Sequence, residues 1–91
     1  MRLQELLVDI EVLRIVGDTS TEVTDIQFDS RRVATGCLFV AQEGTAVDGH
    51  TYIEQCVENG AVAVVLEKEE YIKKNDVCYI LVKNSDEALG K

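Results

Sequence analysis

Apolar residues near the start of the chain recur at helical spacing, at Leu3, Leu6, Leu7 and Ile10. Positions three and four residues apart share one face of a helix, so this spacing predicts a short amphipathic helix. Residues 12–16 are rich in β-branched side chains and end at Gly17-Asp18, a turn signal. They therefore predict a strand.

Residues 23–28 alternate along the chain and predict a half-buried strand, with Thr24, Ile26 and Phe28 on one side. A short, continuously apolar run at residues 38–41 follows Gly36 and predicts a buried strand.

A helix is predicted next, because Thr51 and Glu54 have the spacing of a capping box. One face of this helix is apolar and consists of Tyr52, Ile53, Cys56 and Val57. Gly60 supplies the stop signal. Residues 61–66 are apolar throughout, as expected of a strand that is covered on both faces.

Strand, helix and strand in this order make a βαβ unit, which we expect to be parallel and right-handed. A charged connector, in which one helical turn fits, leads to another buried strand at residues 77–82. Asn84 and Glu87 then resemble a second capping box close to Lys91. We expect one α/β domain with a small, mostly parallel sheet and flanking helices, cut from a longer protein.

Composition narrows the class of function. The 91 residues carry 17 acids and 9 bases, for a formal net charge of −8, which opposes nucleic-acid binding. No apolar run is long enough to span a membrane, so no membrane partner is expected. Cys37, Cys56 and Cys78 form no CxxC pair, and with one histidine they predict no zinc site. Reduced thiols in a cytoplasmic protein are the simplest interpretation.

Two loops follow predicted strands and are the candidate binding rim, because ligands of open α/β sheets bind beyond the carboxyl ends of strands. Residues 29–31 follow the first of these strands and residues 42–49 follow the second. Ser30 suits a ribose or phosphate oxygen, and Arg31 or Arg32 can bind phosphate bidentately. The amides that open the helix near residues 49–52 also favour an anion.

The rest of the rim suits a flat base and a close approach of the backbone. Phe28 or Val47 could lie against a base, and glycines at 44 and 49 permit approaches that a Cβ would block. Each feature also has a purely structural explanation, such as a turn cap for Ser30, a surface charge for Arg31 and a core position for Phe28. No GxxxxGK[ST] loop is present, so NTP hydrolysis is not expected in this stretch.

The stretch "DSRRVATGCLFVAQEGTAVDGHTYIEQCVENGAVAVV" resembles the pattern DSRxVxxGxLFVAxxGxxxDGHxFIxxAxxxGAxAVV of Mur ligase N-terminal domains. The resemblance implies a domain that holds the UDP moiety of a UDP-N-acetylmuramoyl-peptide. Within the family the chain looks most like the tripeptide synthetases, which add meso-diaminopimelate or L-lysine to UDP-N-acetylmuramoyl-L-alanyl-D-glutamate during peptidoglycan synthesis. The alternative is the branch that adds D-alanyl-D-alanine.

Carried onto this sequence, the resemblance places the UDP contacts at Phe28, Ser30, Thr45, Ala46 and Val47, with Arg31 as a possible phosphate contact. It implies no catalytic residue and no cofactor in this stretch, which alone would be inactive. ATP and Mg²⁺ would bind elsewhere in a three-domain ligase, and the partners would be its central and C-terminal domains. Cys37 departs from the family, which usually has a polar residue there.

Two readings from other classes stay open. A noncatalytic interaction module could keep the fold without binding a nucleotide. A thiol-dependent enzyme would use one of the cysteines, although no activating partner is visible in the sequence.

Overall fold

The computed structural model describes residues 2–8, 10–42, 48–73 and 76–83. In chain order its elements are α1 (Leu3–Leu6), β1 (Val12–Val16), β2 (Asp25–Gln27), the 3₁₀ helix η1 (Ser30–Arg32), β3 (Cys37–Val40), the 3₁₀ helix η2 (Gly49–Tyr52), α2 (Ile53–Glu58), β4 (Ala63–Leu66), the 3₁₀ helix η3 (Glu69–Tyr71) and β5 (Cys78–Val82). The second predicted capping box, at residues 84–87, lies outside the described residues.

The strands form one sheet in the order β1-β5-β4-β3-β2. Strands β2, β3, β4 and β5 run parallel to one another, and only β1, at one edge, runs antiparallel to its neighbour β5. The predicted mostly parallel sheet is therefore confirmed. The order also places β2 beside β3, so that the chain leaves both strands at the same edge of the sheet.

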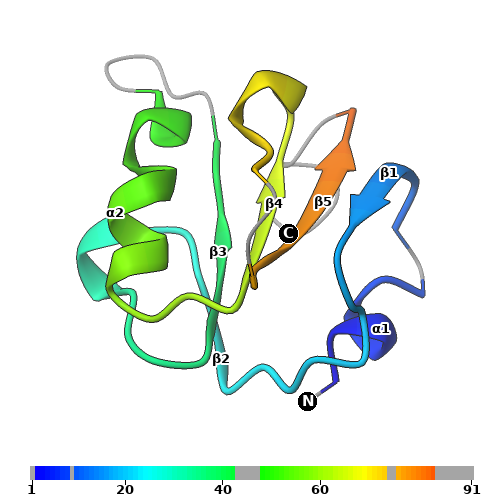
Figure 1. Cartoon of the computed structure of the whole chain (residues 1–91), viewed down its shortest axis with the longest axis horizontal. Helices are drawn as coiled ribbons and strands as arrows, with labels where there is room; N and C mark the ends of the chain where they lie inside the picture. The colour runs from blue at the N-terminus through cyan, green and yellow to red at the C-terminus, as the bar shows by residue number, and fades with distance from the viewer. Residues whose placement is uncertain (1, 9, 43–47, 74–75, 84–91) are drawn as a thin grey trace.

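The sheet has a core on each face because its central strands bury both sets of alternating side chains. In β3, Cys37 and Phe39 join the core beneath α2, whereas Leu38 and Val40 join the core on the side of α1. Figure 1 shows α2 (green) and α1 (dark blue) on opposite sides of the sheet. Every residue of β3 and β4 is buried, as the continuously apolar runs predict.

Two local predictions were wrong. Val23 and Ile26 both pack in the core beside α1, because β2 begins only at Asp25 and strict alternation does not extend back to Val23. The capping box of Thr51 and Glu54 does not form either. The helical path begins one turn earlier, where the Asp48 carboxylate caps η2 and the Thr51 hydroxyl donates to the Asp48 carbonyl at 2.8 Å.

A buried histidine ties η2 to the end of β4. The His50 side chain is fully buried, and its Nε2 accepts the backbone N–H of Glu67 at 2.9 Å. Because Nε2 is an acceptor, the ring proton lies on Nδ1, which donates to Asp48 Oδ1 at 2.7 Å. His50 is therefore a neutral structural residue, and both its nitrogens are satisfied.

Asp48 is the charged centre of this network. Lys68 donates to its Oδ2, and the His50 backbone N–H donates to its Oδ1. These contacts, Lys68 first, hold the pKa of Asp48 well below its ordinary value of 3.8. The carboxylate form is thereby stabilised in the folded state.

Gly60 ends α2 in a conformation that other residues rarely adopt. Its φ is +111°, and a Cβ there would lie 2.6 Å from Thr35 Cα. The Gly60 carbonyl also accepts the N–H of Gly36 at 2.8 Å, so the turn cannot move away freely. The predicted helix stop is confirmed.

Replacing Gly60 with alanine should lower the free energy of unfolding by at least about 2 kcal/mol, because strain in the left-handed region adds to the contact with Thr35. Asn59→Ala, at the exposed neighbouring position, should change it by less than about 0.5 kcal/mol. Urea denaturation followed by circular dichroism measures both. Equal stability of the two variants would contradict this account of the turn.

Asp48→Asn should make stability less dependent on pH in acid. The Asp48 pKa is lower in the folded state than in the unfolded chain, so its stabilising contribution is full above about pH 5 and is lost as the pH falls through 3.8 and below. The variant should be about 1.5 kcal/mol less stable at pH 7 and lose less stability between pH 4 and pH 2. Lys68→Met should likewise reduce the loss of stability between pH 4 and pH 2. Parallel pH profiles for wild type and Asp48→Asn would contradict the assignment.

Candidate functional site

A cavity of about 670 Å³ opens where the chain leaves β2 and β3. Its walls come from four parts of the fold. Phe28, Asp29, Ser30 and Arg31 follow β2, Phe39 lies in β3 and Gln42 follows it, Gly49 and Tyr52 belong to η2, and Gln55 belongs to α2. The loop that follows β2 thus meets, at one rim, the residues on either side of the loop that follows β3. The order of the strands predicts this meeting.

Three of the predicted site residues line this cavity. Phe28 is 42% exposed, which is unusual for a phenylalanine and leaves its ring accessible to a ligand. Ser30 is half-buried at the first position of η1. Arg31 also lines the cavity, and its side chain is exposed. Thr45, Ala46 and Val47 lie outside the described residues.

Asp29 shapes the loop that carries Ser30. Its carboxylate accepts the backbone N–H of Arg31 at 2.9 Å, which caps η1. It also accepts the Arg31 guanidinium in a bidentate pair, from Nε at 3.1 Å and from Nη2 at 3.0 Å. The pair holds the pKa of Asp29 below its ordinary value and raises that of Arg31. Arg31 Nη1 takes no part in this pair.

Gly49 forms the closest contact between the two walls of the cavity. Its N–H donates to the Gln42 carbonyl at 2.7 Å. A Cβ at this position would lie 2.8 Å from that carbonyl oxygen and 3.0 Å from the Gln42 nitrogen. The predicted close backbone approach is therefore present, and it joins the end of β3 to η2.

Two lining residues were missed by reasoning from the sequence, Tyr52 and Gln55. Tyr52 was predicted on the apolar face with Ile53 and Cys56, and that prediction was wrong. The spacing of the two lining residues in the sequence could have identified them. Positions 49, 52 and 55 are three residues apart, and they share a face of the η2–α2 segment that differs from the face buried through Ile53 and Cys56. Tyr52 is 37% exposed and adds a second accessible aromatic ring to the cavity.

The polar groups of this cavity suit binding better than catalysis. Ser30, Gln42 and Gln55 offer neutral hydrogen-bonding groups, and the described part of the cavity contains neither histidine nor cysteine. No cluster of three histidine, cysteine or carboxylate residues that could hold a metal ion occurs among the residues described.

The cysteines lie in the core rather than at the site. All three are free and buried, as the reduced-thiol interpretation predicts. Burial raises the pKa of the Cys56 and Cys78 thiols to about 11, so neither is a ready nucleophile at neutral pH. None of the helices in the described ranges has the length and apolar character needed to cross a lipid bilayer.

Comparison with known proteins finds related sequences along the whole chain. UDP-N-acetylmuramoyl-L-alanyl-D-glutamate–2,6-diaminopimelate ligase of Parabacteroides distasonis is 46% identical over 90 residues, which are 99% of this chain and 18% of that protein. The ligase of the same name from Bacteroides fragilis is 42% identical over 91 residues, 100% of this chain and 19% of that protein. The chain thus spans about a fifth of the length of these relatives.

A solved structure supports the same relationship. The MurF ligase from Thermotoga maritima, in complex with ADP, superposes with a TM-score of 0.62 and 32% identity over 76% of this chain and 15% of that one. The family model described as Mur ligase family, catalytic domain, matches residues 22–91, which include the cavity and all strands after β1. The chain belongs to the Mur ligase family.

Proposed function

We propose that this chain is the UDP-binding part of a ligase that adds 2,6-diaminopimelate to UDP-N-acetylmuramoyl-L-alanyl-D-glutamate in peptidoglycan synthesis. The observation that carries the proposal is the 46% identity to a ligase of that name over nearly the whole chain. The cavity at the ends of β2 and β3 supports it, because it combines accessible aromatic rings with neutral hydrogen-bonding groups. The described cavity residues Phe28 and Ser30 are proposed as contacts of the UDP moiety, together with Thr45, Ala46 and Val47.

A second candidate is the ligase that adds D-alanyl-D-alanine. The superposition on MurF from Thermotoga maritima favours it. We prefer the diaminopimelate-adding ligase because the identity is higher, 46% against 32%, and extends over 99% rather than 76% of the chain.

The remaining parts of the reaction are assigned to the rest of a longer, cytoplasmic ligase. The sequence has no GxxxxGK[ST] loop, and the residues that the structure describes offer no cluster of metal ligands. The residues present therefore do not fit ATP and Mg²⁺, which we place in a central domain, with a C-terminal domain helping to bind the amino acid. This chain alone should form no amide bond.

Nuclear magnetic resonance titration of the 91-residue chain with UDP tests the proposal, with ATP as the comparison. UDP should shift the amide signals of residues 28–31 and of Gly49, Tyr52 and Gln55. If UDP shifts none of these signals, or ATP shifts them equally, the chain is better explained as a noncatalytic interaction module.

Ser30→Ala should weaken UDP binding by about twofold to tenfold, because a net hydrogen bond contributes about 0.5–1.5 kcal/mol. The matched control is Ser20→Ala, since Ser20 lies outside the cavity and bonds to Asp18. Isothermal titration calorimetry gives both affinities. An unchanged affinity for Ser30→Ala would remove Ser30 from the site.

Arg31→Gln should weaken UDP binding by about fivefold, as expected for one exposed charged contact. Uridine lacks phosphate, so its affinity should stay the same in this variant. Arg32→Gln removes the adjacent guanidinium, which does not line the described cavity, and should have little effect on either ligand. If Arg31→Gln weakened uridine and UDP equally, the guanidinium would act by holding Asp29 and not by contacting phosphate.

A further inference from the structure

The segment formed by η2 and α2 lies between two cavities. One of its faces lines the cavity assigned to UDP, to which it contributes Tyr52. Another face lines a second cavity, of about 450 Å³, whose opposite wall is formed by η3 and Lys73. The two cavities share no lining residue, so a side chain can be changed in one of them without changing the lining of the other.

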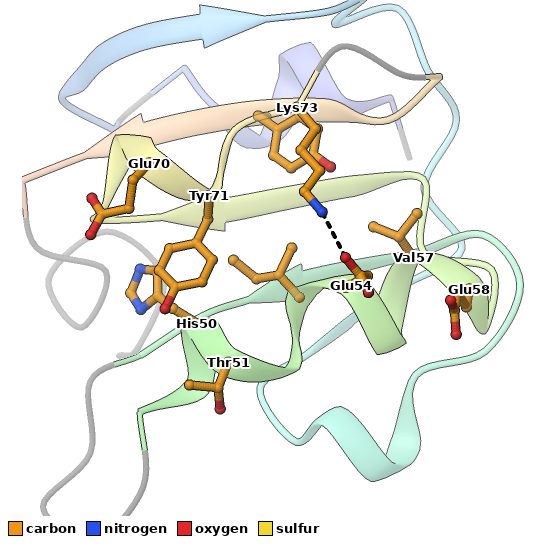
Figure 2. Close-up of a pocket in the computed structure, with 10 residues that line it drawn as sticks. His50, Thr51, Glu54, Val57, Glu58, Glu70, Tyr71 and Lys73 are labelled. Atoms are coloured by element: carbon orange, nitrogen blue, oxygen red, sulfur yellow. Dashed lines mark hydrogen bonds and ion pairs between the residues drawn. The ribbon is translucent and has the colours of Figure 1, made fainter.

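Tyr71 lines the second cavity, and its ring is held within the protein. Figure 2 shows the ring beside that of His50, in the same cavity as the ion pair of Lys73 and Glu54. The centroids of the Tyr71 and His50 rings are 5.5 Å apart, and Tyr71 packs against the core beneath α2. Tyr71 therefore has a structural role, which makes it a suitable control for Tyr52.

Tyr52 has no comparable role in the core. It is partly exposed and belongs to neither core cluster. Among the residues that the structure describes, none forms a hydrogen bond with its hydroxyl group. A phenol at the wall of a cavity can donate one hydrogen bond to a ligand while its ring packs against another part of the same ligand.

Tyr52 lies close to Arg31, although the two come from different walls of the cavity. Arg31 belongs to η1, which follows β2, whereas Tyr52 is the last residue of η2. The pKa of Arg31 lies above its ordinary value chiefly because of the Asp29 carboxylate, and the nearby Tyr52 phenol adds to the rise. The 3₁₀ helix η1 also contacts α2, so the fold itself brings the two side chains together.

The charge of Arg31 is already partly used. Its Nε and Nη2 donate to Asp29, and Nη1 takes no part in that pair. Because the Asp29 carboxylate offsets much of the charge of the guanidinium, Arg31 attracts an anion less strongly than an unpaired arginine would. A neutral O–H donor beside it strengthens the binding of an anion without adding a competing charge. Tyr52 supplies such a donor.

We propose that the Tyr52 hydroxyl and Arg31 Nη1 donate to the same diphosphate group of UDP, from two walls of the cavity. A diphosphate has several acceptor oxygens, so it can satisfy both donors at once. Tyr52 is then a specificity-determining residue, because its hydroxyl favours ligands that carry phosphate over ligands that do not. The inference rests on the proposed binding of UDP and adds a residue to that site.

Tyr52→Phe tests the inference because it removes the hydroxyl and keeps the ring. It should weaken UDP about fivefold, the effect of one net hydrogen bond, and leave the affinity for uridine unchanged. Tyr71→Phe makes the same chemical change in the second cavity and should alter neither affinity. Nuclear magnetic resonance titration of the 91-residue chain gives the dissociation constants. An unchanged affinity of Tyr52→Phe for UDP, or equal losses for UDP and uridine, would overturn the inference.

A double-mutant cycle with Arg31→Gln tests whether the two donors act on one group. Independent losses of about fivefold each would multiply to about 25-fold, whereas two donors to one diphosphate should lose clearly less than that in the double variant. Losses that simply multiply would show two separate contacts and refute the shared group. If wild type does not bind UDP, the proposed function fails and this inference with it. If wild type binds UDP and Tyr52→Phe binds it equally well, only this inference fails.

Discussion

The short segment η2 is held at two points, and both cavities depend on how it is held. On one side the Gly49 amide bonds to the Gln42 carbonyl, so closely that no side chain fits between them. On the other side His50 accepts the Glu67 amide and donates to Asp48. A buried imidazole bonded at both nitrogens is costly to disturb, because either broken bond leaves a polar group without a partner. The segment is therefore fixed between the ends of β3 and β4.

Charge is organised locally in a protein whose overall charge is strongly negative. Arg31 pairs with Asp29, Lys68 with Asp48, and Lys73 with Glu54. Exposed pairs of this kind contribute little to stability on their own. Their effect is on geometry, because the pair of Lys73 and Glu54 joins two walls of one cavity and the pair of Arg31 and Asp29 fixes the shape of the loop that lines the other. The pair of Asp48 and Lys68 differs from the others, since it is largely shielded from solvent and is coupled to the buried histidine.

The parallel part of the fold could be predicted from the sequence, because a strand that is buried on both faces has a continuously apolar sequence. The runs at residues 38–41 and 61–66 are continuously apolar, and both contain a fully buried strand. The start of the helix could not be predicted in the same way. Thr51 and Glu54 have the right spacing for a capping box, but the Asp48 carboxylate competes for the same turn and also gains Lys68, which is distant in sequence. A local motif was therefore overridden by a tertiary contact.

The site residues that directly follow a strand could be predicted from the sequence. Those that line the site because they lie on one face of a helical segment could not. Ser30 and Phe28 follow β2 directly, so the rule for parallel sheets places them at the rim. Tyr52 and Gln55 line the same cavity only because the segment from Gly49 onward is helical, which separates its residues into faces. The same separation directs Thr51, Glu54 and Glu58 to the second cavity. One helical wall thus presents neutral amide and phenol groups to one cavity and carboxylates to the other.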